Sequence, residues 1–284
     1  MSGRGVRDQI EGLDPATDFQ RICFLSASYD FPWDVEQSLS LAFFKTYGIP
    51  TISSLLDRTG EFRERAQKRY DDTKLILAEM SEHGLDSERG REANRRMNQM
   101  HVRFPIQNDD YIYVLSTIVL EPIRWNRRWG WRKYTDKELQ AQLAYMREMA
   151  RRMNIRDLPP TLESLDKWSR AYEAAKFRFT ESNRRVADYT LYLFLSWFPR
   201  PARPLVRRAM LAILDDALLD AFGYERPGKA ARTLVDLALR MRAIVIRFLP
   251  RRRSPHLVTR ERMRSYPHGY VLADLGVADM AAGS

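Results

Sequence analysis

The chain has 284 residues, of which 44% are hydrophobic and 30% charged, and this composition excludes an intrinsically disordered protein. Its formal net charge is +10, and only eight of its 47 basic residues are lysines, so arginine dominates. Arginine suits the phosphates of nucleic acid or lipid headgroups, but solvated helix faces and codon usage explain the excess more simply, so the charge does not define the function.

Two features of the sequence indicate the cellular compartment and whether any segment spans a membrane. The single cysteine, Cys23, cannot form a disulfide within the chain, and the first residues lack the basic and apolar regions of a secretory signal. We therefore expect a cytoplasmic protein. The longest strongly apolar stretch, residues 189–198, ends at Pro199 and falls well short of the ~20 residues that span a bilayer, so we expect no membrane-spanning segment.

Helical periodicity recurs along almost the whole chain, and the sequence contains no Asn-Gly or Asp-Gly hairpin signal. The prediction is an all-α fold. Residues 1–49 mix aromatic side chains with single helical turns and are treated as an N-terminal arm. Beyond them, helices are predicted at residues 62–82, 88–102, 110–127, 161–177, 181–198, 205–222 and 230–249.

The clearest helix start lies at Thr135. Its side chain can accept a hydrogen bond from the Glu138 amide while Glu138 reaches back, which is the capping-box pattern. The helix that follows must end before Pro159. Its expected core face consists of residues that share one side at 3.6 residues per turn: Leu139, Leu143, Met146, Ala150 and Met153.

The chain is predicted to form one domain. Residues 198–204 hold three prolines, and so short a segment is typical of a corner between helices and not of a domain linker. We divide the single domain, residues 1–284, into the arm (1–49), a helical core (50–250) and a C-terminal tail (251–284) whose end is expected to be mobile.

The chain offers few metal ligands. There is no cysteine cluster, no His-Glu-x-x-His and no pair of Glu-x-x-His motifs, and the four histidines are scattered. His101 lies late in a predicted helix, on the face that carries Asn94, Met97 and Asn98. On these facts a hydrogen-bonded structural histidine explains it more readily than a metal ligand. If the protein has a redox cofactor, a haem on one axial histidine is the type that this ligand set could hold.

A second group of polar residues lies upstream. Arg69 and Thr73 are four residues apart, on a helix face shared with Ile76, Leu77 and Met80. In a dry pocket they could stabilise dioxygen or its partly negative forms through charge-assisted hydrogen bonds. The alternative is an ion pair of Arg69 with a carboxylate and a hydrogen bond from Thr73 to its own helix backbone.

The ordered set Arg69-x-x-x-Thr73, followed 28 residues later by His101 in Arg-Met-Asn-Gln-Met-His, resembles the arginine–threonine pair and axial histidine of latex clearing proteins (rubber oxygenases) and their MpaB relatives. The similarity extends to residues 108–125 and to the Ser265-Tyr-Pro-His-Gly-Tyr270 segment, and covers most of the chain. It implies an all-α, single-domain helical bundle enclosing a b-type haem (heme b, with its iron). His101 is then the proximal ligand, with Arg69 and Thr73 on the distal side.

The resemblance also implies an activity. The family uses dioxygen to cleave carbon–carbon double bonds of isoprenoid chains, which are rubber for latex clearing proteins and a farnesyl chain for MpaB. We therefore expect a haem-dependent oxygenase that acts on an apolar small molecule or a polyisoprenoid-like substrate containing an alkene.

This sequence departs from the family at two places. Rubber oxygenases carry a lysine that can cap the iron just before the distal threonine, and here the residue is Asp72, which could instead accept a proton. The family's proposed carboxylate base lies upstream of the arginine. The base is not assigned here, because that region offers only Ser53 or Ser54, with Asp57, Glu61 and Glu64 nearby.

The alternative hypothesis is a non-catalytic, basic helical protein that binds anionic lipid or nucleic acid. Arg240, Arg242, Arg247 and residues 251–253 motivate it, because they accompany a helix rich in apolar residues. Such a helix can lie on a membrane surface, although a buried core helix is the commoner origin of the pattern. The two hypotheses are compatible: an enzyme on apolar substrates can contact a membrane peripherally, and no specific nucleic acid is expected.

Overall fold

The computed structural model describes residues 5–276, and in this range the regular structure is helical throughout, without a strand. The all-α prediction is confirmed. The elements in chain order are α1 (Val6–Glu11), α2 (Phe19–Leu25), η1 (Ser26–Asp30), α3 (Pro32–Tyr47), α4 (Pro50–Thr59), α5 (Glu61–Glu64), α6 (Ala66–His83), α7 (Glu88–His101), α8 (Asn108–Trp129), α9 (Asp136–Arg152), α10 (Leu162–Lys176), α11 (Glu181–Ser196), η2 (Arg200–Ala202), α12 (Arg203–Ile213), α13 (Asp216–Phe222), α14 (Lys229–Phe248), η3 (Val258–Arg260) and η4 (Leu272–Asp274).

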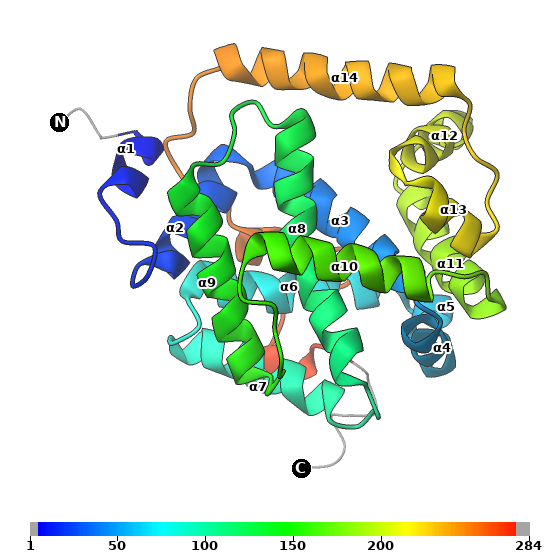
Figure 1. The fold of residues 1–284 in the computed structure, drawn as a ribbon, viewed down its shortest axis with the longest axis horizontal. Helices are drawn as coiled ribbons and strands as arrows, with labels where there is room; N and C mark the ends of the chain where they lie inside the picture. The colour runs from blue at the N-terminus through cyan, green and yellow to red at the C-terminus, as the bar shows by residue number, and fades with distance from the viewer. Residues whose placement is uncertain (1–4, 277–284) are drawn as a thin grey trace.

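The helices pack around α8, which passes through the middle of the molecule (Figure 1). Helix α3 lies along α8, α2 pairs with α9, and α6 pairs with α7. One apolar cluster joins α6, α7, α8 and α9 through residues such as Leu75, Met97 and Met146. A second cluster joins α3, α11 and α13, with Phe44 and Phe222 among its members.

The predicted helix over residues 205–222 is wrong as a single element. Helix α12 ends at Ile213 and α13 begins at Asp216, because Leu214 is extended with ψ 144°. The Asp215 side chain accepts a hydrogen bond from the Leu218 amide at 2.9 Å. An aspartate that caps a following helix favours a new start over continuation of the old one.

The region before residue 66 is more regular than the sequence indicated. Helix α3 has 16 residues where single turns were expected, and α4 was not predicted. The predicted helix over 62–82 is divided at Arg65 into α5 and α6. Helix α3 buries Asp34, Ser38, Lys45 and Thr46, and these polar residues on its inner face hide the apolar period.

The capping box at α9 is confirmed. The Glu138 amide donates to Thr135 Oγ1 at 3.3 Å, and the Thr135 amide donates to Glu138 Oε2 at 2.8 Å. The helix ends at Arg152, before the proline pair as predicted, and it buries Met146 and Ala150 of the expected core face. The proline-rich stretch is also a corner, since η2 connects α11 to α12.

A threonine-to-alanine substitution tests the cap. Thr135→Ala is expected to lower the free energy of unfolding by about 1 kcal/mol, because the Glu138 amide loses its acceptor at a helix start. Urea denaturation measures this change. Thr233→Ala, at an exposed position within α14, is the control and should cost little. Equal losses in the two variants would contradict the role of the cap.

The described part of the C-terminal tail packs against α6 and α7, and residues 258–276 are called the strap here. Glu82 accepts a hydrogen bond from the Val258 amide at 2.6 Å, and Arg96 donates to the Leu275 carbonyl at 2.7 Å. Residues 277–284, where the mobile end was expected, lie outside the described residues. Among the described helices, none combines the length and apolar character that crossing a membrane would require.

Candidate active site around His101

Arg69 and Thr73 are joined on one face of α6. The Arg69 guanidinium donates to Thr73 Oγ1, and this hydroxyl donates to the Arg69 carbonyl at 2.9 Å. Thr73 thus makes the backbone hydrogen bond foreseen as the structural alternative. Within residues 5–276, Arg69 forms no ion pair with a carboxylate, and its guanidinium lies 5.7 Å from the centre of the Phe62 ring.

His101 is the last residue of α7, and its ring meets Tyr111 of α8 edge to face, with centroids 5.6 Å apart. Its Nδ1 atom is buried and has no hydrogen-bond partner among the described residues. Burial lowers the pKa of His101 to about 4, and the positive charge of Arg69 makes a smaller contribution in the same direction. The ring is therefore neutral at pH 7, and the predicted residues Arg69, Thr73 and His101 lie in one neighbourhood.

The surroundings of Arg69 are aromatic. Tyr47 of α3 packs edge to face on Phe62 at 5.5 Å. Burial raises the pKa of Tyr47 to about 12, against the opposing effects of a hydrogen bond with Thr190 and the charge of Arg69. Tyr47 thus keeps its proton at neutral pH. Sequence reasoning missed Tyr47 and Phe62, because helix α3 was not predicted and the break at Arg65 removes Phe62 from the helical register of Arg69.

The donor set at His101 fits a haem. A buried imidazole nitrogen without a partner costs about 1–3 kcal/mol, and a ligand that uses its lone pair removes this cost. The described residues contain no group of three or more His, Cys, Asp or Glu side chains able to hold a metal ion. One neutral histidine suits a cofactor that brings four nitrogen donors of its own.

Asp72 is occupied by structural contacts. Its carboxylate, 2% exposed, accepts hydrogen bonds from Lys68 Nζ at 2.7 Å, from the Gly276 amide at 2.9 Å and from the Tyr266 hydroxyl. Tyr270 of the same strap donates to Glu79 of α6. Asp72 therefore holds the strap on α6, and the Ser265–Tyr270 motif supplies the tyrosines for that attachment.

Asp72→Asn tests this role. The substitution removes the charge that pairs with Lys68, so we expect a loss of about 1–3 kcal/mol in the free energy of unfolding and faster tryptic cleavage within the strap. Limited proteolysis with mass spectrometry measures the cleavage rate. Asp274→Asn, an exposed position of the strap, is the matched control. Unchanged cleavage together with lost activity would instead indicate a chemical role for Asp72.

The side chains considered for the base are also engaged. Asp57 pairs with Arg185 at 2.7 Å, and Glu61 pairs with Arg65 at 2.5 Å. Glu64 pairs with Arg63, Ser53 donates to Asn183, and Ser54 donates to the Thr51 carbonyl at 3.2 Å. In the described part of the chain, none of these groups is hydrogen-bonded to Arg69 or Thr73, so the base stays unassigned.

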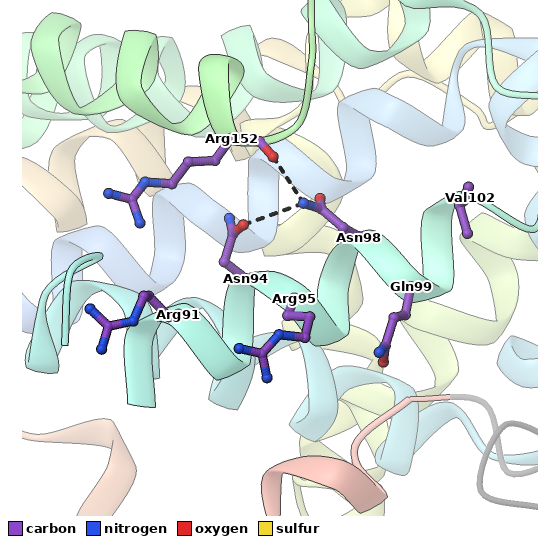
Figure 2. Close-up of a pocket in the computed structure, with 7 residues that line it drawn as sticks. All are labelled: Arg91, Asn94, Arg95, Asn98, Gln99, Val102 and Arg152. Atoms are coloured by element: carbon purple, nitrogen blue, oxygen red, sulfur yellow. Dashed lines mark hydrogen bonds between the residues drawn. The ribbon is translucent and has the colours of Figure 1, made fainter. Parts of the chain in front are cut away.

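A cavity of about 520 Å³ lies on the outward face of α7 and is lined mainly by arginine and amide side chains (Figure 2). Asn98 donates to the Arg152 carbonyl at 2.9 Å and to Asn94 at 3.3 Å there. Its lining includes neither Arg69 nor His101. The two asparagines expected on the His101 face thus lie toward this cavity, while the His101 ring turns to Tyr111.

Most of the chain is similar to known proteins. Residues 48–246, which include Arg69, Thr73 and His101, match the family model described as ER-bound oxygenase mpaB/B′ and rubber oxygenase, catalytic domain. The ER-bound oxygenase mpaB′ of Penicillium brevicompactum is 30% identical over 78% of this chain and 57% of its own length.

Two mpaB proteins give similar matches. ER-bound oxygenase mpaB of Penicillium brevicompactum is 31% identical over 66% of this chain and 53% of its own length. ER-bound oxygenase mpaB of Penicillium roqueforti (strain FM164) is 29% identical over 70% of this chain and 73% of its own length. The chain thus spans little more than half of the length of the two Penicillium brevicompactum relatives.

Proposed function

We propose that this chain, which belongs to the family of ER-bound oxygenase mpaB/B′ and rubber oxygenase catalytic domains, is a haem-dependent oxygenase. Its substrates are dioxygen and an apolar molecule with an alkene, of which an isoprenoid chain is the favoured class. The names of the relatives support the oxygenase chemistry. The observation that carries the cofactor proposal is the buried, neutral and unpartnered nitrogen of His101.

His101 would hold the haem iron. A bound b-type haem supplies the electron-transfer and dioxygen chemistry that side chains lack. A ligating imidazole must be neutral, and burial together with the charge of Arg69 keeps His101 unprotonated at pH 7. Edge-to-face packing on Tyr111 fixes the orientation of the ring.

Arg69 and Thr73 would act on dioxygen and not on the iron. Their mutual hydrogen bond fixes the guanidinium at one place on α6. The neighbouring Phe62 and Tyr47 rings exclude water, and in such surroundings a guanidinium donates strong hydrogen bonds to an oxygen atom that gains negative charge. Both rings are buried, so the surroundings of Arg69 are apolar.

An absorption spectrum of the purified full chain tests the proposal before any substrate is chosen. We expect a Soret band that shifts on reduction with dithionite, and saturable binding when haemin is added to cofactor-depleted protein. Oxygen uptake is then measured with a short isoprenoid alkene and with its saturated analogue as control. A hydrazine reagent detects carbonyl products, which distinguish cleavage from hydroxylation. A colourless protein that does not bind haemin would overturn the proposal.

A further inference from the structure

Helix α14 presents its apolar side chains to the outside. Six large residues are each at least 50% exposed: Leu234, Leu237, Met241, Ile244, Val245 and Phe248. At 100° per residue these positions fall within an arc of about 100°, so they form one stripe along the helix. We call these six residues the α14 stripe. A surface helix normally turns such a stripe to the core, and Ala243 is the only buried residue of α14.

The opposite face of α14 is firmly attached, so the stripe does not belong to a detached helix. Figure 1 shows α14 along one edge of the molecule, and it contacts α8 and α12. Asp236 accepts hydrogen bonds from Arg128 and Trp129, both at 2.9 Å. Arg242 pairs with Asp34 at 3.0 Å and stacks over the Trp33 ring at 3.7 Å. These contacts hold the stripe toward solvent.

The border of the α14 stripe is basic. Asp236 is the one acidic residue between positions 229 and 253, and Arg128 and Arg240 pair with it. Within residues 5–276, Lys229, Arg247 and residues 252 and 253 have no ion pair, while Arg251 donates to helix-end carbonyls. Lys229, Arg240 and Arg247 fall along the same side of the stripe by helical position.

We propose that α14 and residues 251–253 form a docking surface for an anionic lipid bilayer. The α14 stripe inserts at the boundary between headgroups and acyl chains, and the arginines bind headgroup phosphates. The apolar stripe matches the acyl region of an anionic bilayer, and the unpaired basic residues match its headgroups. This docking surface is independent of haem binding and of oxygenase activity.

Two other occupants fit the surface less well. A second copy packed on the same face would bring two basic borders together, because both ends of α14 carry unpaired cations, and like charges across an interface oppose association. Nucleic acid would satisfy the arginines but would leave the α14 stripe exposed to water or against phosphates. An anionic bilayer removes the α14 stripe from water and also pairs the basic border with headgroup phosphates.

Vesicle flotation with the purified full chain tests the proposal. We expect binding to vesicles of phosphatidylcholine mixed with phosphatidylserine, weaker binding to phosphatidylcholine alone, and a decrease with added salt. The double variant Ile244→Glu, Phe248→Glu should bind at least about tenfold more weakly, since two anions replace inserted apolar groups. Arg247→Glu with Arg252→Glu should lose roughly tenfold or more of the binding to the anionic vesicles.

The control for the stripe is Val271→Glu, which changes an apolar side chain of 61% exposure next to η4, an element that contacts α7. It should bind like the wild type. Helical content and melting temperature are measured for every variant. They should match those of the wild type, because all the substituted positions are exposed. The proposal fails if anionic vesicles do not float the protein or if the stripe variant binds as well as the wild type. A dimer that the stripe variant dissociates, without vesicle binding, would assign the face to a second copy, and salt-sensitive DNA binding alone would assign it to nucleic acid.

Discussion

His101→Ala is expected to yield colourless protein, with the haem content per chain lowered at least about tenfold. The substitution removes the one ligand that the protein is proposed to give the iron, and the remaining apolar contacts hold a free haem loosely. Haem is quantified from the reduced pyridine adduct, and the Soret band is recorded for the same samples. Because His101 ends α7 and is half-buried, helical content should be retained.

His83→Ala is the matched control for this experiment. His83 also lies at the end of a helix, but it is exposed and its Nε2 lies 3.4 Å from Glu79. The control protein should keep its haem. Red His101→Ala protein with an unchanged Soret band would refute the assignment of His101. Loss of haem in both variants would indicate a general effect on the fold and not on ligation.

Glu138→Gln should destabilise the protein by about 3 kcal/mol at pH 7, which corresponds to a melting temperature lower by roughly 5–10 °C. Glu138 is 1% exposed, and its oxygens accept hydrogen bonds from Arg132 at 2.8 Å and from Ser26 at 2.6 Å. A neutral amide leaves the half-buried Arg132 with Asp30 as its remaining carboxylate partner. Uncompensated charge in a protein interior is costly.

The effect of this substitution should depend on pH. Burial raises the pKa of Glu138, but the hydrogen bonds and charge of Arg132 outweigh it, so the pKa lies below its ordinary value of 4.5. The unfolded chain therefore takes up this proton first, and the stabilisation is complete above pH 4.5 and is lost as the pH falls through the folded-state pKa.

Denaturation of wild type and variant at neutral and acidic pH measures this trend. The difference in unfolding free energy should narrow in acid. Glu225→Gln, at an exposed position, should cost little at either pH. A difference that widens as the pH falls would contradict the role of the Glu138 carboxylate.

Local interactions were readable from the sequence. The α9 capping box and the ends of α7 and α10 agree with prediction to within a residue or two, because a cap and an apolar period depend on neighbours within one or two turns. The order and spacing of Arg69, Thr73 and His101 were also visible, and the family that they indicated is confirmed. The separate start of α13 was not predicted, although its capping residue, Asp215, is visible in the sequence.

Contacts between segments that are distant along the chain could not be predicted from the sequence. Asp72 stands directly before the distal Thr73 in the motif, yet its carboxylate binds the strap, including the Gly276 amide 204 residues away. Polar residues on the inner face of α3 concealed this helix, and the partners of Asp34 and Lys45 lie on α8 and α10. The apolar period of α14 was visible, but a period alone does not say whether a stripe faces the core or solvent. The direction that a stripe faces depends on which other helices cover it. Only the tertiary structure shows that no other helix among the described residues covers the α14 stripe.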